Sequence, residues 1–306
     1  MTSLIELLAS SPFFFIGTCV VLGLCIGSFL NVVIYRVPVI LERQWRQECA
    51  ELTSTEAPNA MTAVAQAGGT FNLLVPRSTC PACKAPITAV QNIPVLSYLF
   101  LKGRCASCGV RISPRYPAIE ALTAVLSAAV AWKFGFGWPT LAALVLTWFL
   151  IALTFIDIDT QLLPDSLTLP LLWIGLLLSL WAPLGHGAPI PADPRSSIIG
   201  AITGYLSLWS VYHLFRLLTG KEGMGYGDFK LLAALGAWFG YQMLLPIILF
   251  SAVVGTVLNV GVMVVRRQDR SIPFAFGPYL AAAGWLMLMF GQELVASYWA
   301  LYPSQP

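Results

Sequence analysis

The chain has 306 residues, of which 58% are hydrophobic and only 10% are charged. Soluble domains contain about 25% charged residues, so this chain has too few charges to cover the surface of a soluble fold. Its mean hydropathy is +0.78, and its net charge of +3 is small. Composition therefore excludes a cytosolic enzyme, a disordered protein and a nucleic-acid-binding protein. No HExxH motif is present, which excludes a zincin metalloprotease.

Apolar segments long enough to cross a bilayer recur along the chain. A membrane-spanning helix needs about 20 mostly apolar residues, and the first such run contains no charged residue. We interpret the apolar stretch from Phe229 to Val265 as two helices hinged at Gly240-Tyr241-Gln242, because a single helix there would leave seven spans. The sequence thus predicts an all-α polytopic membrane protein with about eight transmembrane helices, at 12–35, 117–134, 138–156, 166–184, 196–218, 229–240, 242–265 and 274–300.

The distribution of Lys and Arg predicts which loops share one side of the membrane. Cytoplasmic loops are enriched in these residues. Nine of them lie in 36–116, three in 216–230 and three in 266–270, whereas Lys133 and Arg195 alone fall in the alternate loops. This bias favours eight spans, a cytoplasmic 36–116 segment and both termini on the opposite side.

The chain divides into three predicted regions: a first transmembrane helix (1–36), a cytoplasmic loop (37–116) and a transmembrane domain (117–300). The first basic residue, Arg36, follows the first apolar run. A cleavable signal peptide carries its positive charge before that run, so we expect the first span to be retained. Within the loop, residues 55–70 show no periodicity and are expected to form a flexible insert.

The first half of the cytoplasmic loop has a short helical pattern. Four apolar residues fall on one face of an otherwise charged run: Leu41, Trp45, Cys49 and Leu52. This spacing predicts a short helical segment in the first half of the loop.

Two CxxC pairs in the second half of the loop predict a zinc site. They are Cys80-Pro-Ala-Cys83 and Cys105-Ala-Ser-Cys108, followed by Gly109. Each CxxC turn supplies two thiolates, so together the pairs complete a tetrahedral site of four cysteines that leaves no open position for a substrate. The alternative, two disulfides or unrelated thiols, is less favoured because the loop is predicted to lie in the reducing cytosol. We expect the zinc to be structural.

Acidic residues at the cytoplasmic ends of two predicted spans form a second candidate site. Asp157 and Asp159 close the third span, and Asp228 opens the sixth within Gly225-Tyr-Gly227-Asp228. Two apposed carboxylates share one proton, so the ionised member can activate water while the protonated member polarises a peptide carbonyl. This is aspartic-protease chemistry. Gly225 and Gly227 are expected to adopt positive φ and to let the backbone approach an extended substrate.

Two other interpretations of these carboxylates stay open on spacing alone. Asp residues at helix ends frequently cap the helix or lie in solvated turns, and Asp228, Asp159 and Asp165 could each do so. A proton-coupled transporter would also carry membrane carboxylates, and it is the alternative function. Transporters usually place charges near the bilayer midplane and often contain an internal repeat, whereas these acidic residues lie at one rim and we find no repeat.

The order of these motifs resembles that of the type IV prepilin leader peptidases, a family of GxGD-type intramembrane aspartic proteases. The resemblance extends almost from end to end and includes both CxxC pairs. The other segments that carry it are Gly27-Ser-Phe-Leu-Asn31-Val-Val-Ile-Tyr-Arg36-Val-Pro38, Asn92-Ile-Pro-Val-Leu-Ser-Tyr98, Ile112-Ser-Pro-Arg-Tyr-Pro-Ala-Ile-Glu120, Asp157-Ile-Asp-Thr-Gln-Leu-Leu-Pro-Asp165 and Gly225-Tyr-Gly-Asp228.

The resemblance implies which carboxylates are catalytic. In the family, the first catalytic Asp lies seven residues before the Pro of a Leu-Pro or Ile-Pro pair. That Pro is Pro164 here, which selects Asp157. Asp157 and Asp228 are then the catalytic pair, and Asp159 and Asp165 become supporting residues.

The resemblance also implies a two-step reaction at the cytoplasmic face of the bacterial inner membrane, with both termini periplasmic. The enzyme removes a short basic leader from prepilins of type IV pili and pseudopilins of type II secretion systems. It then methylates the new N-terminal amine with S-adenosylmethionine. Pilin substrates and membrane lipid are the expected partners, and nucleic acid is not.

Methyl transfer rests on the resemblance alone, because no fingerprint of a soluble methyltransferase is present. We assign it to the 36–116 loop without a residue set for S-adenosylmethionine. Gly103 is a candidate for this activity, with an ordinary turn glycine as the alternative. Asn31 and Glu120 are buried polar candidates, and their alternative role is hydrogen bonding between helices.

Overall fold

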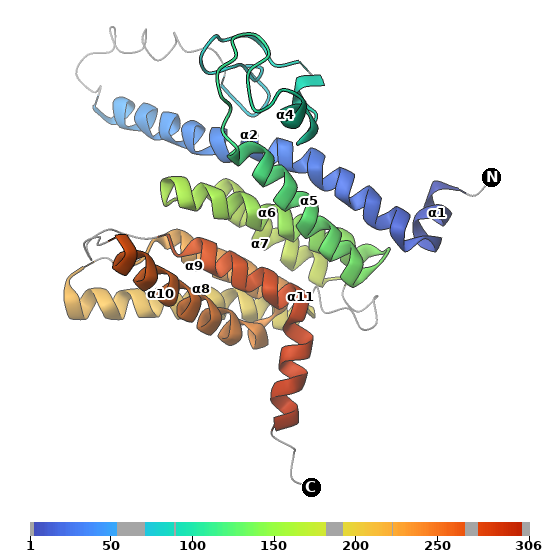
Figure 1. Cartoon of the computed structure of the whole chain (residues 1–306). Coiled ribbons are helices and arrows are strands. Elements are labelled where there is room, and N and C mark those ends of the chain that lie inside the picture. The colour runs from blue at the N-terminus through green and yellow to red at the C-terminus, as the bar shows by residue number, and fades with distance from the viewer. Residues whose placement is uncertain are drawn as a thin grey trace. The chain divides into compact units, whose positions relative to one another are not determined.

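A computed structural model describes residues 3–53, 71–88, 90–181, 192–221, 223–266 and 275–301. Within these ranges every regular element is a helix, as predicted (Figure 1). The helices are α1 (Leu4–Ser10), α2 (Pro12–Thr53), α4 (Leu96–Phe100), α5 (Arg115–Phe134), α6 (Trp138–Thr160), α7 (Asp165–Ser179), α8 (Pro194–Thr219), α9 (Tyr226–Phe239), α10 (Leu244–Arg266) and α11 (Gly277–Leu301). Two short 3-10 turns, η2 (Val90–Asn92) and η4 (Tyr241–Met243), complete the set. The chain forms two units, residues 16–128 and residues 1–15 with 129–306.

Long apolar helices confirm a multi-pass membrane protein. In the described ranges, five segments are long and apolar enough to cross a bilayer: Pro12–Leu52, Arg115–Phe134, Trp138–Thr160, Pro194–Thr219 and Tyr241–Gly261. Each contains most or all of a predicted span. The other three predicted spans overlap with α7, α9 and α11 in the described residues. The total of eight spans stays a prediction, since α7 and α9 have only 15 and 14 residues.

The predicted hinge at Gly240 is confirmed. Helix α9 ends at Phe239, and η4 then leads into α10. Gly240 has φ 78°, a left-handed conformation that glycine adopts without steric cost. Its N–H donates to the carbonyl of Gly236 at 2.8 Å, and a Cβ at position 240 would collide with the Ser196 side chain. A glycine is therefore required where the two helices separate.

Helix α9 is the core of the unit formed by residues 1–15 and 129–306, here called the transmembrane unit. Every residue from Asp228 to Phe239 except Lys230 is buried. A helix that is apolar on all sides must be enclosed by other helices, and α9 packs against α7, α8 and α11. Trp238 anchors it to α7: its Nε1–H donates to the carbonyl of Leu171 at 2.8 Å, and its ring lies beside Gly175.

On the α8 side of α9, glycines allow the two backbones to touch. A Cβ on Gly200 would collide with the carbonyl of Gly236, and one on Gly204 would lie 2.7 Å from the carbonyl oxygen of Leu232. Small residues permit this close packing between membrane helices. Helix α9, and with it Asp228, is thus held in place along its whole length.

In the other unit, α2 is longer than predicted. The predicted first span and the helical pattern that follows it belong to one continuous helix of 42 residues that contains Pro38. The helical pattern is confirmed, and the charges from Arg36 onward mark a polar environment without ending the helix. Trp45 and Leu52 on this extension are exposed. The predicted insert at 55–70 lies outside the described residues.

Helices α2 and α5 meet at their backbones. A Cβ on Gly27 would lie 2.7 Å from the Cα of Glu120, and one on Gly23 would lie 2.8 Å from the Cα of Ala124. Asn31 links the same helices, since its Nδ2 donates to the carbonyl of Tyr116 at 3.1 Å. The interhelical hydrogen-bonding role considered for Asn31 is therefore present.

Residues 71–114, here called the knuckle lobe, are attached to both helices. Arg36 in α2 is buried, and its guanidinium donates to the carbonyls of Asn72 at 2.8 Å and Pro76 at 2.6 Å. The carboxylate of Glu120 in α5 accepts from the backbone N–H of Val95 at 2.7 Å. A buried charge with several hydrogen bonds fixes its partners firmly, so these contacts hold the lobe against the middle of α2 and the start of α5.

Candidate active site and metal centre

The two CxxC pairs come together as the sequence predicted. The sulfurs of Cys80, Cys83, Cys105 and Cys108 all lie within 4.8 Å of one another, and those of Cys80 and Cys108 are 3.9 Å apart. Zn–S bonds of about 2.3 Å in a tetrahedron place sulfurs about 3.8 Å apart. All four are free thiols. The cluster can therefore hold a metal ion with little movement.

The two knuckles have the same backbone design. In the first, Cys80 N–H donates to the Ala85 carbonyl and Lys84 N–H donates to the Cys80 carbonyl, both at 2.9 Å. The second repeats this with Cys105, Val110 and Gly109, also at 2.9 Å. The closing residue has positive φ in both, 60° at Lys84 and 72° at Gly109. Gly109 suits its turn as predicted, whereas Lys84 adopts a conformation that is uncommon for a non-glycine residue.

Backbone N–H groups in each knuckle favour thiolates. Those of Cys108 and Ser107 lower the pKa of the Cys105 thiol to about 6. In the first knuckle, the N–H groups of Cys83 and Ala82 lower the pKa of Cys80. A hydrogen bond to the charged form of a group stabilises that form, and the thiolate is the form that binds metal. The donor set thus fits a cation that prefers sulfur, such as Zn²⁺.

Gly103 lies between α4 and the second knuckle in a turn that requires glycine. It has φ 67°, and a Cβ there would lie 2.8 Å from the Tyr98 hydroxyl oxygen. Its N–H donates to the Tyr98 carbonyl, and its carbonyl accepts from the Ile112 N–H, both at 2.8 Å. These contacts give Gly103 a clear structural role, and its link to methyl transfer stays a prediction.

The transmembrane unit contains the two carboxylates selected above, and both are buried. Asp157 is 4% exposed at the end of α6, and Asp228 is 7% exposed in the first turn of α9. Asp157 Oδ2 has no hydrogen-bond partner among the described residues. A buried polar atom without a partner is costly, which is typical of a group that binds something else during its function.

Leu163 contacts two glycines that lie next to this pair, Gly227 beside Asp228 in the chain and Gly277 against Asp157. A Cβ at Gly227 would lie 2.6 Å from Leu163 Cβ, and a Cβ at Gly277 would lie 3.1 Å from Leu163 Cδ1. The turn after α6 therefore contacts the start of α9 and the start of α11. Gln161 makes this turn possible, since it has φ 54° and its N–H donates to the Asp157 carbonyl at 2.9 Å.

Asp159 and Asp165 have different surroundings from the buried pair. Asp159 is exposed. Asp165 accepts from Lys230 Nζ at 2.6 and 2.8 Å, which joins the start of α7 to the first turns of α9. A partly exposed ion pair contributes little stability, but this one links the helix that carries Asp228 to the turn that follows Asp157.

The expectation of positive φ at Gly225 and Gly227 is wrong. Gly225 is the N-cap of α9 with φ −79°, and Gly227 is absent from the residues of positive φ. Gly227 is needed for a different reason: it lies in the first helical turn, where a side chain would collide with Leu163. The glycine motif provides space beside the carboxylates, with ordinary helical backbone.

Gly277 at the start of α11 was missed by the sequence reasoning. Its Cβ, if present, would lie 2.6 Å from Asp157 Oδ2, and its N–H interacts with the same carboxyl group. The only local signal is a Gly-Pro pair at the first turn of an apolar helix, Gly277-Pro278, where Pro is common at any helix N-terminus. Its closeness to Asp157 arises from packing alone.

Comparisons with known proteins agree with this organisation. Residues 21–134 match the model of the bacterial peptidase A24 N-terminal domain, and residues 144–260 match that of the type IV leader peptidase family. No solved structure matches the chain.

Three similar proteins are each called prepilin leader peptidase/N-methyltransferase. That of Aeromonas salmonicida strain A449 is 52% identical over 298 residues, which cover 97% of this chain and 98% of the relative. That of Pseudomonas aeruginosa is 48% identical over 295 residues, covering 96% and 97%. That of Neisseria gonorrhoeae is 47% identical over 303 residues, covering 97% and 99%. With two family models matched in order and about half of all residues identical over almost the full length, the chain belongs to the type IV leader peptidase family.

Proposed function

We propose that this chain is a prepilin leader peptidase and N-methyltransferase of the bacterial inner membrane. The observation that carries the proposal is the near full-length identity to relatives of that name. Its substrates are prepilins and pseudopilins, from which it removes a basic leader at the cytoplasmic face. Both termini are periplasmic in this assignment, which rests on the distribution of Lys and Arg.

Asp157 and Asp228 are the proposed catalytic pair for cleavage. Two interacting carboxylates can hold one proton between them. The ionised one takes a proton from water, whose oxygen attacks the scissile carbonyl carbon, while the protonated one donates to the carbonyl oxygen. The tetrahedral intermediate then collapses as its C–N bond breaks, and the amine leaves with a proton from a carboxyl group. The burial of both groups and the unpartnered Asp157 Oδ2 support this assignment, among the residues that the structure describes.

Gly227 and Gly277 are proposed to keep space beside this pair. A side chain introduced at either position would collide with Leu163 or Asp157. Such a substitution would move a carboxylate from its working position, and errors of about 1 Å in a catalytic group can cost about 100-fold in rate.

The cluster of four cysteines is proposed to hold one structural zinc ion. Cys80, Cys83, Cys105 and Cys108 would bind it and complete its coordination, so the ion crosslinks the knuckles and offers no position to a substrate. The second step transfers a methyl group from S-adenosylmethionine to the new N-terminal amine. We assign this step to the family's N-terminal region and name no residues for it.

A proton-coupled transporter is the weaker candidate. In α6 to α11, Glu293 alone among the described Asp, Glu, Lys and Arg residues lies more than five residues from a helix end, and it forms an ion pair with Lys133 near the end of α5. Transporters place their ion sites near the midplane, so this distribution does not support one.

The deciding experiment uses the purified full chain in detergent with a synthetic prepilin and S-adenosylmethionine. We expect cleavage directly after a glycine, followed by one methyl group on the new terminus, both read by mass spectrometry. Failure to cleave, together with proton uptake by proteoliposomes, would overturn the proposal in favour of transport.

A further inference from the structure

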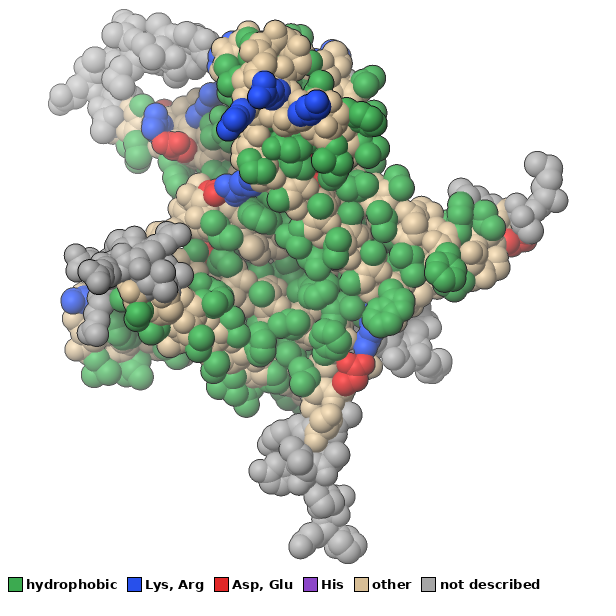
Figure 2. Space-filling view, viewed as in Figure 1, with side chains coloured by type: hydrophobic (Ala, Val, Ile, Leu, Met, Phe, Trp, Pro, Cys, Tyr) green, Lys and Arg blue, Asp and Glu red, His purple; other side chains and the backbone are tan. Residues whose placement is uncertain are grey.

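The knuckle lobe has an unusual charge distribution. Residues 71–114 contain five Lys and Arg residues and no Asp or Glu. Figure 2 shows basic side chains gathered on the lobe next to hydrophobic ones. A surface whose charged side chains are all positive attracts anions.

Helix α4 in the same lobe exposes a row of large apolar side chains. Leu96, Leu99 and Phe100 are 52%, 64% and 83% exposed, and no residue of α4 is buried. Because α4 is apolar except at Ser97 and Tyr98, leaving it in water is unfavourable. A patch of this kind next to basic residues is typical of a surface that meets a membrane.

The attachment of α4 to α5 places it at the level of the membrane edge. Val95, which precedes α4, donates its N–H to the carboxylate of Glu120. Glu120 lies three residues inside the predicted span 117–134, or about 4.5 Å along the helix. With the span at 117–134 as predicted from the sequence, helix α4 begins at the depth where lipid headgroups give way to acyl chains.

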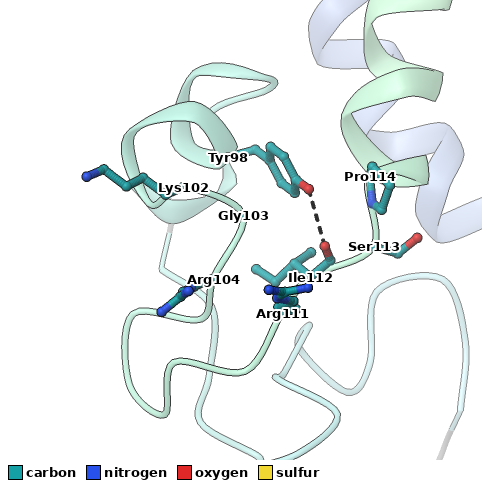
Figure 3. Close-up of a pocket in the computed structure, with 8 residues that line it drawn as sticks. All are labelled: Tyr98, Lys102, Gly103, Arg104, Arg111, Ile112, Ser113 and Pro114. Carbon is teal, nitrogen blue, oxygen red and sulfur yellow. Dashed lines mark hydrogen bonds between the residues drawn. The ribbon is translucent and has the colours of Figure 1, made fainter.

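The cations that follow α4 line a cavity of about 600 Å³ (Figure 3). Its lining includes Tyr98, Lys102, Gly103, Arg104 and Arg111. Figure 3 shows Lys102 and Arg104 extending away from Tyr98. Among the described residues, Lys102, Arg104 and Arg111 form no ion pair. Their charges are therefore available to an external anion.

We propose that α4 and these cations form a lipid-binding surface on the anionic leaflet beside the lobe. Leu96, Leu99 and Phe100 insert at the boundary of headgroups and acyl chains, while Lys102, Arg104 and Arg111 bind phospholipid phosphates. The inference goes beyond the proposed function and does not depend on it. Lipid is favoured over the pilin leader because that leader is basic and the lobe would repel it.

Photo-crosslinking in nanodiscs tests the insertion of α4. Benzoylphenylalanine replaces Phe100 in the full chain, and its matched control replaces Leu52, which is 81% exposed on α2. The first span is predicted to end at residue 35, and Leu52 lies 17 residues beyond it. This separation is about 25 Å along the helix. In phosphatidylglycerol nanodiscs we expect at least about threefold more lipid adduct at position 100 than at position 52. Equal yields would overturn the proposal.

The same label at Leu99 serves as a second position if the Phe100 variant does not fold, as judged by its zinc content. Adding a synthetic prepilin tests the other occupant of the surface. If position 100 then cross-links to prepilin and never to lipid, the surface is a substrate site and the proposal is wrong.

Charge removal tests the phosphate contacts. Lys102→Gln with Arg111→Gln should lower the adduct yield at position 100 at least about twofold in phosphatidylglycerol but leave it unchanged in phosphatidylcholine. Arg77→Gln, which removes an exposed lobe cation outside the cavity, should have no effect. An equal loss with Arg77→Gln would contradict the proposal. A second contradicting result would come from chemical modification of the cavity arginines. If soluble glycerol phosphate protects them and lipid does not, the cavity is a site for small anions.

Discussion

Gly277 lies directly against Asp157: the Cβ of a side chain at position 277 would lie 2.6 Å from Asp157 Oδ2, closer than Cβ atoms approach other atoms in folded proteins. This relationship joins the first turn of α11 to the end of α6, two elements that are far apart in the chain. It makes the start of α11 part of the wall around the carboxylate pair.

The first prediction concerns that contact. Gly277→Ala should lower cleavage by about 10- to 100-fold, because the Asp157 carboxylate must move to admit the methyl group. The effect should fall on kcat more than on KM. Gly261→Ala in α10 is the matched control, since the position has open space for a Cβ, and it should cleave normally. Equal activity of the two variants in the prepilin assay would mean that Gly277 does not position Asp157.

The second prediction concerns the carboxylates themselves. Asp157→Asn and Asp228→Asn should each reduce cleavage by at least about 100-fold, because neither group can perform the other's proton transfer. Asp159→Asn should keep substantial activity, since Asp159 is exposed. Thermal unfolding and zinc content of each variant should match the parent. Normal cleavage by Asp228→Asn would end the aspartic-protease assignment.

The third prediction concerns the knuckles. Purified protein should contain about one zinc ion per chain, bound by four thiolates. Cys80→Ser or Cys105→Ser should lower the metal content and speed proteolysis of the lobe, because the loop loses its crosslink. Cys49→Ser, outside the cluster, should retain full zinc. Metal analysis that finds no zinc in fresh, reduced protein would refute this assignment.

The fourth prediction separates the two activities. Asp157→Asn should fail to methylate a precursor but should still methylate a pre-cleaved pilin, if the methyl donor binds away from the carboxylates. Mass spectrometry of the pilin terminus provides the readout. Loss of methylation on pre-cleaved pilin would instead favour one shared site.

Gly103→Val tests the same separation from the other side. A β-branched residue cannot easily adopt the φ of 67° at this position, and its Cβ would collide with Tyr98. Methylation should fall by a larger factor than cleavage, with zinc retained. A parallel loss of both activities together with zinc would show that the substitution only unfolds the lobe.

Sequence patterns predicted the features that depend on local chemistry. Apolar runs mark the helices because a membrane excludes unpaired backbone groups, whatever the neighbouring helices are. The two CxxC pairs predicted their cluster because each knuckle closes through hydrogen bonds within a few residues, from Cys80 to Ala85 and from Cys105 to Val110. Gly240 predicted a break between helices because its conformation is a property of one residue.

Tertiary packing decided the features that join distant parts of the chain. Spacing alone left Asp157 and Asp159 as equals, and the family resemblance was needed to choose between them. In the structure, one is buried and the other exposed, because nearby residues of a helix turn to different faces and only the neighbouring helices determine which face is covered. For the same reason the space beside Gly227 and the contact of Gly277 with Asp157 could not be read from sequence: each depends on a side chain brought from another helix or turn by the fold.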